Sequence, residues 1–240
     1  MAGSTFTITV DGVGVPAREG QTVIQACDEA GIYIPRLCYH PDLIPGGHCR
    51  MCTCLIDKRP AAACITPATP GMTVENDTPE CNADRRAILE MMFVEGNHIC
   101  PACEKSGCCE LQALGYRLGM LAPALPYLWP YREVVATHPD IFIDYNRCIL
   151  CNRCVRASRL ADGKTVFALE GRGIRTHINT GSEGRLDATT LAAADKAAHV
   201  CPVGAILIKR TAFLVPYGER EFDKRPIGAG IEARRQAAKG

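Results

Sequence analysis

The sequence lacks the segments that would place it in a membrane or send it out of the cell. Its 240 residues contain no uninterrupted apolar run of roughly 18 residues, the length at which a membrane-spanning helix is suspected. The opening stretch, MAGSTFTITVDGVGVP, has neither the basic start nor the apolar core of a secretory signal. We therefore expect a soluble cytoplasmic protein with no membrane span.

An excess of charge of one sign is also absent. The chain has 27 Lys and Arg against 26 Asp and Glu, a formal net charge of +1, so no field favours nucleic acid as a partner. A dinucleotide-binding fingerprint is missing as well, because GRGIRTHINTG does not have the G-x-G-x-x-G order between a strand and a helix. We expect that this chain itself binds no flavin or NAD.

Cysteine, in contrast, is abundant, with 15 residues. Disulfides, structural zinc and iron-sulfur clusters all use cysteine at high density. Disulfides are rare in the reducing cytoplasm. An odd number of cysteines also cannot all pair into disulfides, since one thiol would be left over. The cysteines therefore point to metal, and their spacing must separate zinc from clusters.

The most diagnostic spacing lies in CILCNRC, near residue 150. Three cysteines at strict three-residue spacing can surround three corners of a cubane cluster, and a distant Cys-Pro can supply the fourth. Zinc sites normally use two separated pairs of ligands, so this spacing favours a 4Fe-4S cluster and leaves zinc as the alternative. The expected ligands are Cys148, Cys151, Cys154 and Cys201.

A second set of cysteines lies in CYHPDLIPGGHCRMCTCLIDKRPAAAC. A loop cysteine, a C-x2-C pair and a distal cysteine also hold the cluster of plant-type 2Fe-2S ferredoxins. The glycines before the pair let the backbone approach inorganic sulfur closely. We expect His40 and His48 to lie beside this site without binding it. The expected ligands of this 2Fe-2S site are Cys38, Cys49, Cys52 and Cys64.

The stretch NHICPACEKSGCC supplies a C-x2-C-x5-C triplet without a fourth cysteine at cluster spacing. The histidine two residues before the triplet is the candidate fourth ligand, although a hydrogen-bonded or exposed histidine is the ordinary alternative. A neutral imidazole in place of a thiolate makes a cluster less negative and raises its potential, as in Rieske centres. The expected ligands of this second 4Fe-4S site are His98, Cys100, Cys103 and Cys109.

The other cysteines have no partner at ligand spacing, and we expect them to pack as small apolar residues. They are Cys27, Cys54, Cys81 and Cys108. Four arginines cluster around the last cysteine set, where they either compensate cluster charge or dock a partner, or else form a solvated polar face. These are Arg147, Arg153, Arg156 and Arg159.

Local patterns predict an α+β fold. TFTITV followed by Asp-Gly predicts a hairpin, and Thr22 with Gln25 has the spacing of a capping box for a helix that stops at Gly31. Further helices are predicted over residues 83–95, with Asn82 or Asp84 as the cap, directly after residue 109, and over 186–198. Strands are predicted at DIFID, TVFALE and GIRTHIN, and a loop over 180–184.

These elements divide the chain into four parts. Residues 1–78 form a ferredoxin-like β-grasp with the 2Fe-2S site, and residues 79–138 form a small helical domain whose 4Fe-4S site uses one histidine and three cysteines. Residues 139–210 form a 4Fe-4S domain like that of bacterial ferredoxins. Residues 211–240 have no core pattern and are expected to be an arm that docks a partner.

The order of these ligands resembles the N-terminal electron-transfer region of the large peripheral-arm subunit of NADH:quinone oxidoreductase, and the N-terminus of iron-only hydrogenases. GGHCRMC, CPACEKSGCCELQ and CILCNRCVR with CPVGAI carry the resemblance. With no large catalytic domain after residue 210, the sequence is most similar to the small diaphorase subunits of NAD-reducing nickel-iron hydrogenases. In the broader family the histidine stands four residues before its first cysteine, where this chain has Gly96. Iron-only hydrogenases also carry two ferredoxin cubanes where this chain has ligands for one.

The resemblance implies one 2Fe-2S and two 4Fe-4S clusters, and a relay subunit with no catalytic residue of its own. Its expected partners are a flavin- and NAD-binding diaphorase large subunit and the small and large hydrogenase subunits. A relay subunit of an NAD-dependent formate dehydrogenase or of NADH:quinone oxidoreductase is the alternative in the same class. A zinc-stabilised interaction scaffold is the alternative in a different class.

Overall fold

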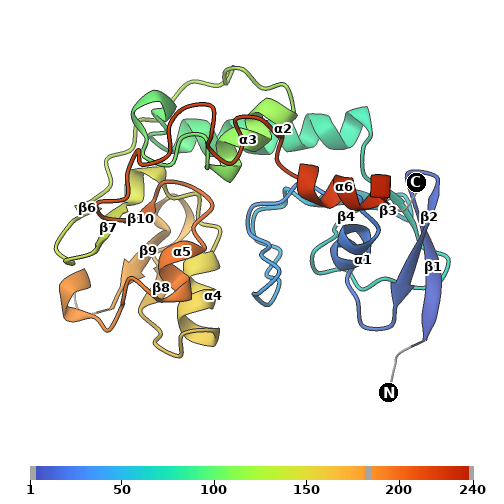
Figure 1. The fold of residues 1–240 in the computed structure, drawn as a ribbon, viewed down its shortest axis with the longest axis horizontal. Helices are drawn as coiled ribbons and strands as arrows, with labels where there is room; N and C mark the ends of the chain where they lie inside the picture. The colour runs from blue at the N-terminus through green and yellow to red at the C-terminus, as the bar shows by residue number, and fades with distance from the viewer. Residues whose placement is uncertain (1–3, 182–184, 238–240) are drawn as a thin grey trace.

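The structure is a computed structural model that describes residues 4–181 and 185–237. An N-terminal sheet with helix α1 occupies one end of the molecule, and two small sheets with α4 and α5 occupy the other (Figure 1). Helices α2 and α3 lie along one side and connect the two ends (Figure 1). No helix of the described residues is both long enough and apolar enough to cross a membrane.

The N-terminal sheet has five strands in the order β2-β1-β5-β3-β4, with β1 parallel to β5 and the other pairs antiparallel. Asp11 and Gly12 connect β1 to β2 with φ angles of 48° and 77°, as a two-residue hairpin turn requires. The predicted capping box is present, because Thr22 N donates to Gln25 Oε1 at 2.9 Å at the start of α1. The bounds are β1 Thr5–Val10, β2 Val13–Arg18, α1 Val23–Glu29, β3 Thr53–Ile56, β4 Arg59–Ala62 and β5 Thr73–Glu75.

The connecting part consists of α2 Pro79–Glu95, the 3-10 turn η1 Cys100–Ala102 and α3 Glu110–Arg117. The prediction for the start of α2 was wrong, since the helix begins at Pro79 and is capped by neither Asn82 nor Asp84. Thr78 Oγ1 accepts a hydrogen bond from Cys81 N at 3.2 Å, and the ring of Pro79 fixes the first helical φ. The helix predicted after Cys109 is present as α3.

The C-terminal part contains the sheet β10-β7-β6 and the hairpin β8-β9. The predicted helix over 186–198 is wrong: only η4 and α5 form there. Asp195 Oδ2 accepts from Ala192 N at 2.7 Å and Thr189 Oγ1 accepts from Leu191 N at 3.3 Å, so side chains replace the helical bonds. GIRTHIN is a strand only from His177, and residues 182–184 of the predicted loop lie outside the described residues. The bounds are β6 Val134–Val135, β7 Ile141–Asp144, η2 Tyr145–Arg147, α4 Arg153–Leu160, β8 Phe167–Glu170, η3 Gly173–Arg175, β9 His177–Thr180, η4 Leu186–Ala188, α5 Lys196–His199 and β10 Ile206–Ile208.

The last described segment packs against the chain itself, whereas the sequence predicts an arm without a core. Ile227 is buried, and α6 (Ala229–Ala237) lies along α1 (Figure 1). Arg117 on α3 donates to Ile227 O at 2.8 Å and pairs with Glu232 on α6. This segment therefore joins the N-terminal domain to α3. Docking of a partner stays a prediction for the exposed residues before it.

The three parts share a central hydrophobic cluster. Its buried members include Cys38, Cys109 and Cys151, one predicted ligand from each cysteine set. Met51, Leu89 and other apolar side chains fill the space between them. The three predicted sites therefore lie around one packed interior.

Candidate metal centres

The first predicted site is formed by the loop after α1 and by the residues that flank β3 and β4. All four cysteines, Cys38, Cys49, Cys52 and Cys64, are buried. Cys38 exchanges side-chain hydrogen bonds with Cys49 and Cys64, and Cys52 does so with Cys64. The structure therefore brings the four predicted sulfurs into one connected group.

The thiols of this group share their protons unequally. The S–H groups of Cys49 and Cys64 donate to the sulfur of Cys38 and lower the pKa of Cys38 well below its usual range. The pKa of Cys64 is raised above its usual range because its proton is held by Cys38 and Cys52. Backbone also approaches the sulfur, since Cys38 N donates to Cys49 Sγ at 3.3 Å. The arrangement can stabilise negative charge on sulfur, as metal ligation requires.

The glycine loop of the first site needs its glycine. Gly47 has a φ of +66°, and a Cβ added there would lie 2.8 Å from Ile65 Cδ1. Cys54 faces the core, where its sulfur is close to Cys52 O and Asn76. His40 Nδ1 accepts from Asp42 N at 3.2 Å, so this histidine has a partner outside the cysteine group.

The second predicted site is a small cavity between α2, η1 and α3. His98 is buried, and its Nε2 has no hydrogen-bond partner among the described residues. Burial and the charges of Arg147 and Arg132 lower the pKa of His98 to about 4, so the imidazole is neutral at neutral pH. A buried, neutral nitrogen without a partner is available to a metal. All four predicted ligands line the cavity, namely His98, Cys100, Cys103 and Cys109.

The short loop before Cys100 places His98 above Gly96. A Cβ added to Gly96 would lie 2.5 Å from His98 Nε2. The ring also packs edge-on against Phe93, with 5.4 Å between the ring centroids. His98 therefore fills the space beside position 96, where the resembling family carries its histidine.

The third predicted site is a small cavity with mainly apolar walls. Leu150 and Asn152 have φ angles of 53° and 58°, which the three-residue cysteine spacing did not predict. Left-handed residues in such a loop turn backbone N–H groups into a concavity that suits an anion. Burial raises the pKa of Cys148 to about 11, so loading the site must release protons. The four predicted ligands, Cys148, Cys151, Cys154 and Cys201, all line this cavity.

The second and third sites touch each other. Arg147 Nη1 donates to Cys103 Sγ at 3.6 Å, and Glu110 N donates to Pro202 O at 2.9 Å. A Cβ added to Gly204 would lie only 2.7 Å from Cys103 Sγ. Sequence reasoning missed Gly204, although the glycine stands just after the Cys-Pro pair.

Of the four arginines near the third site, some fit a role at the clusters and one fits a solvated polar face. Arg153 is buried and Arg156 donates to Cys38 O in the first site, so these are not a solvated face. Arg147 is half-buried beside Cys103. Arg159 is exposed and fits the solvated interpretation.

The second and third sets of predicted ligands each line one cavity. Zinc requires donors within about 2.3 Å of one point. In residues 4–181 and 185–237, no three or more His, Cys, Asp or Glu side chains are arranged to hold a metal ion. The choice of clusters over zinc therefore rests on the spacing of the cysteines in the sequence.

Three segments of the chain match known domain families. Residues 3–79 match a 2Fe-2S iron-sulfur cluster binding domain, and residues 141–208 match a 4Fe-4S single cluster domain. Residues 85–123 match the NADH-ubiquinone oxidoreductase-G iron-sulfur binding region. The chain therefore contains both 2Fe-2S and 4Fe-4S domains, and the predicted fold class is confirmed.

Similar proteins match most of the chain. The NAD-reducing hydrogenase HoxS subunit gamma of Cupriavidus necator is 39% identical over 226 residues, which are 94% of this chain and 96% of that protein. A crystal structure of an NAD+-reducing [NiFe]-hydrogenase in the H2-reduced state contains a chain that is 47% identical, with a TM-score of 0.92. The match covers 97% of this chain and 99% of that one.

The NADH-ubiquinone oxidoreductase 78 kDa subunit of Neurospora crassa is 35% identical over 86% of this chain, but the match covers 28% of that protein. The chain thus spans less than a third of this longer relative. The match to the Cupriavidus necator protein runs over nearly the whole of both chains. The chain belongs to the family of NAD-reducing hydrogenase gamma subunits, which is related to the iron-sulfur subunits of NADH:ubiquinone oxidoreductase.

Proposed function

We propose that this chain is the electron-relay subunit of a hydrogen:NAD oxidoreductase and carries out no bond-making step itself. The observation that carries the proposal is the arrangement of three predicted ligand sets around one interior. Arg156, on the helix of the third site, donates a hydrogen bond to Cys38 O of the first site. Gly204, close to Cys201 of the third site, packs against Cys103 Sγ of the second site. The relatives named as subunits or chains of NAD-reducing hydrogenases support the same function.

The proposed ligands follow the three cavities and cysteine groups. Iron-sulfur clusters bound there would supply one-electron carriers. The residues of the chain hold these groups, bury them and fix the distances between them. The first site holds a 2Fe-2S cluster on Cys38, Cys49, Cys52 and Cys64. The second holds a 4Fe-4S cluster on His98, Cys100, Cys103 and Cys109, and the third a 4Fe-4S cluster on Cys148, Cys151, Cys154 and Cys201.

The proposed partners are the other subunits of the same complex. A flavin- and NAD-binding diaphorase subunit exchanges electrons at one end of the relay, and the small and large hydrogenase subunits stand at the other. The long match to the Cupriavidus necator subunit favours this assembly over a formate dehydrogenase or NADH:quinone oxidoreductase. A cytoplasmic location stays a prediction.

The proposal is tested on the chain purified without oxygen together with its partners. We expect roughly ten iron atoms and as many acid-labile sulfides per copy of this chain, in addition to those that the partner subunits hold, together with signals of both cluster types by low-temperature EPR and hydrogen-dependent reduction of NAD. If the purified protein contains zinc and no acid-labile sulfide, the relay function is wrong and a zinc-stabilised interaction scaffold takes its place.

Ligand variants test each site separately. Cys52→Ser, Cys103→Ser and Cys154→Ser should each perturb or remove the signal of one site and leave the other two. Cys108→Ser is the matched control, because this half-buried cysteine lies next to a proposed ligand but outside the set. Loss of the same signal in Cys103→Ser and Cys108→Ser would contradict the assignment.

A further inference from the structure

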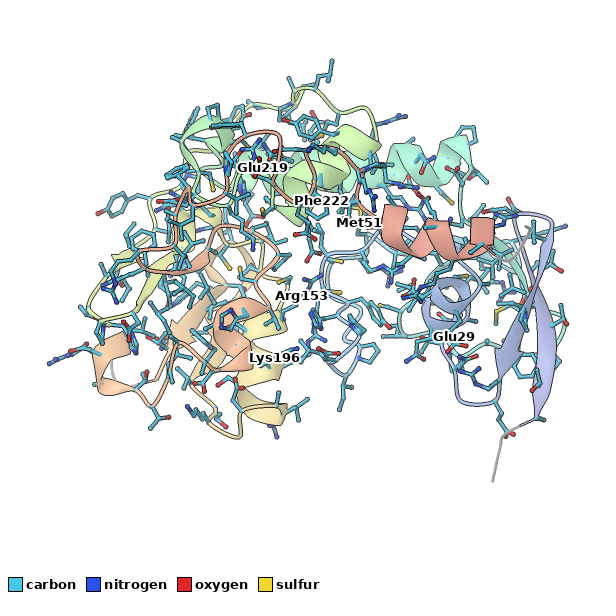
Figure 2. The ribbon with its side chains drawn as sticks, viewed as in Figure 1. Glu29, Met51, Arg153, Lys196, Glu219 and Phe222 are labelled. Atoms are coloured by element: carbon cyan, nitrogen blue, oxygen red, sulfur yellow. The ribbon has the colours of Figure 1, made fainter. Side chains whose placement is uncertain are left out.

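Arg153 begins α4, between two of the cysteines that line the third cavity. Its side chain is 3% exposed, so its charge is held inside the protein. Figure 2 shows it where α4 faces the loop of the first site. A buried guanidinium is stable only if its N–H groups have partners.

The two terminal nitrogens of Arg153 reach a neighbour of a proposed ligand in every site. They form a two-bond pair with Glu110, at 2.6 and 2.7 Å, next to Cys109 of the second site. Nη2 donates to Tyr39 O at 2.8 Å, next to Cys38 of the first site. Nη1 is 3.4 Å from Val200 O, next to Cys201 of the third site. One side chain thus connects three segments that are far apart in the sequence.

The remaining donor of Arg153 has no partner. Nε is buried and makes no hydrogen bond with the described residues. The guanidinium interacts electrostatically with Cys151 and Cys201, which line the third cavity. Nη1 lies 3.4 Å from Val200 O, next to Cys201, so the positive charge is near a site whose ligands carry negative charge.

We propose that Arg153 is a positioning residue that holds the three sites at fixed separations and raises the midpoint potential of the third. Its buried charge favours the reduced form of the group held there, because that form carries one more electron. Its terminal nitrogens meanwhile hold the loops of the first and second sites against α4. This inference rests on the ligands proposed above.

The test is an EPR-monitored redox titration of the intact complex, with the third signal identified by its loss in Cys154→Ser. At the wild-type midpoint potential, Arg153→Gln should lower the ratio of reduced to oxidised third site on the order of tenfold. Arg153→Lys keeps the charge but lacks the Nε–H and the planar fork, so its decrease should be smaller. The magnetic interaction between the reduced first and third sites should also weaken in both variants.

Arg159→Gln is the matched control, because it removes the same charge from an exposed position of the same helix. We expect its ratio to stay at the wild-type value. An unchanged ratio in Arg153→Gln with its iron retained, or an equal decrease in Arg159→Gln, overturns the proposal. A wild-type complex without a third cluster signal refutes the proposed ligands instead.

A double variant covers the case in which Arg153→Gln loses its iron. Arg153→Met with Glu110→Leu removes both partners of the ion pair, which avoids a lone buried charge. If it binds iron, a weaker magnetic interaction between the reduced first and third sites supports the positioning role, and the wild-type interaction overturns it. If it also loses its iron, Arg153→Lys decides: a decreased ratio of reduced to oxidised third site supports the proposal, and the wild-type ratio overturns it.

Discussion

Gly204 shows at the scale of one residue how closely two sites approach. A methyl group at this position would lie 2.7 Å from Cys103 Sγ, and its other close neighbours are Arg147 and Lys105. Gly204→Ala should therefore displace Cys103 and lower the iron content of the second site, as measured by iron analysis and EPR. Gly230→Ala, which meets no heavy atom within 4 Å, should keep full iron content. A fully loaded second site in Gly204→Ala would show that this contact does not matter.

His98 offers a second prediction at this scale. We expect His98→Cys to keep the second cluster but to lower its midpoint potential, because a thiolate adds negative charge. The measurement is an EPR redox titration, with the exposed His177→Cys as the control. The same spectrum and potential in His98→Cys and wild type would argue against ligation by His98.

The residues that surround inorganic groups differ in how far the sequence predicts them. The spacing of Cys148, Cys151 and Cys154 is local, so it predicts a set of ligands without knowledge of the fold. The proximity of Gly204 to Cys103 depends on how two separate loops pack, and no local pattern carries that information. The unpaired Nε2 of His98 likewise became visible only with the burial of its ring.

Helix α2 is the element that connects the first domain to the second site. Thr78→Ala removes the oxygen that accepts from Cys81 N, and should lower the free energy of unfolding by about 1 kcal/mol. Chemical denaturation of the loaded protein measures this change. Thr69→Ala is the control, since Thr69 is exposed and its side chain makes no hydrogen bond with the described residues. Equal stability of the two variants would contradict the capping role.

Elements were predictable where a local signal dominates. The Asp-Gly turn and the capping box of α1 depend on residues within four positions of each other, and both are present. The helix predicted over 186–198 was wrong because the side chains of Thr189 and Asp195 accept hydrogen bonds from backbone N–H groups that a helix would use. The predicted start of α2 was wrong because Thr78 already serves as the cap and Pro79 as the first helical residue.

At the scale of the whole molecule, residues 226–237 form a clasp between the N-terminal domain and α3. Arg117 stacks on Tyr33 at 4.9 Å, donates to Ile227 O and pairs with Glu232. Gly228 lies against the same ring, where a Cβ would come within 2.3 Å of Tyr33 Cγ. The arrangement of the three parts thus depends on contacts between distant residues, which explains why sequence patterns did not predict it.

Arg117→Ala should open this clasp. We expect hydrogen exchange of the α6 amides to accelerate on the order of fivefold to tenfold, because a charged hydrogen bond and an ion pair are lost. Arg172→Ala, at an exposed position far from α6 in the sequence, should leave the exchange rates unchanged. Unchanged exchange in Arg117→Ala would mean that other contacts hold the clasp closed.

The clasp also sets an order of events during synthesis. A ribosome delivers the N-terminal domain first and residues 226–237 only after every element that they touch. Gly228 therefore closes onto Tyr33 last, after the cysteine loops have emerged and can receive iron. Until that moment Tyr33 and Arg117 lack the contacts that residues 226–237 supply.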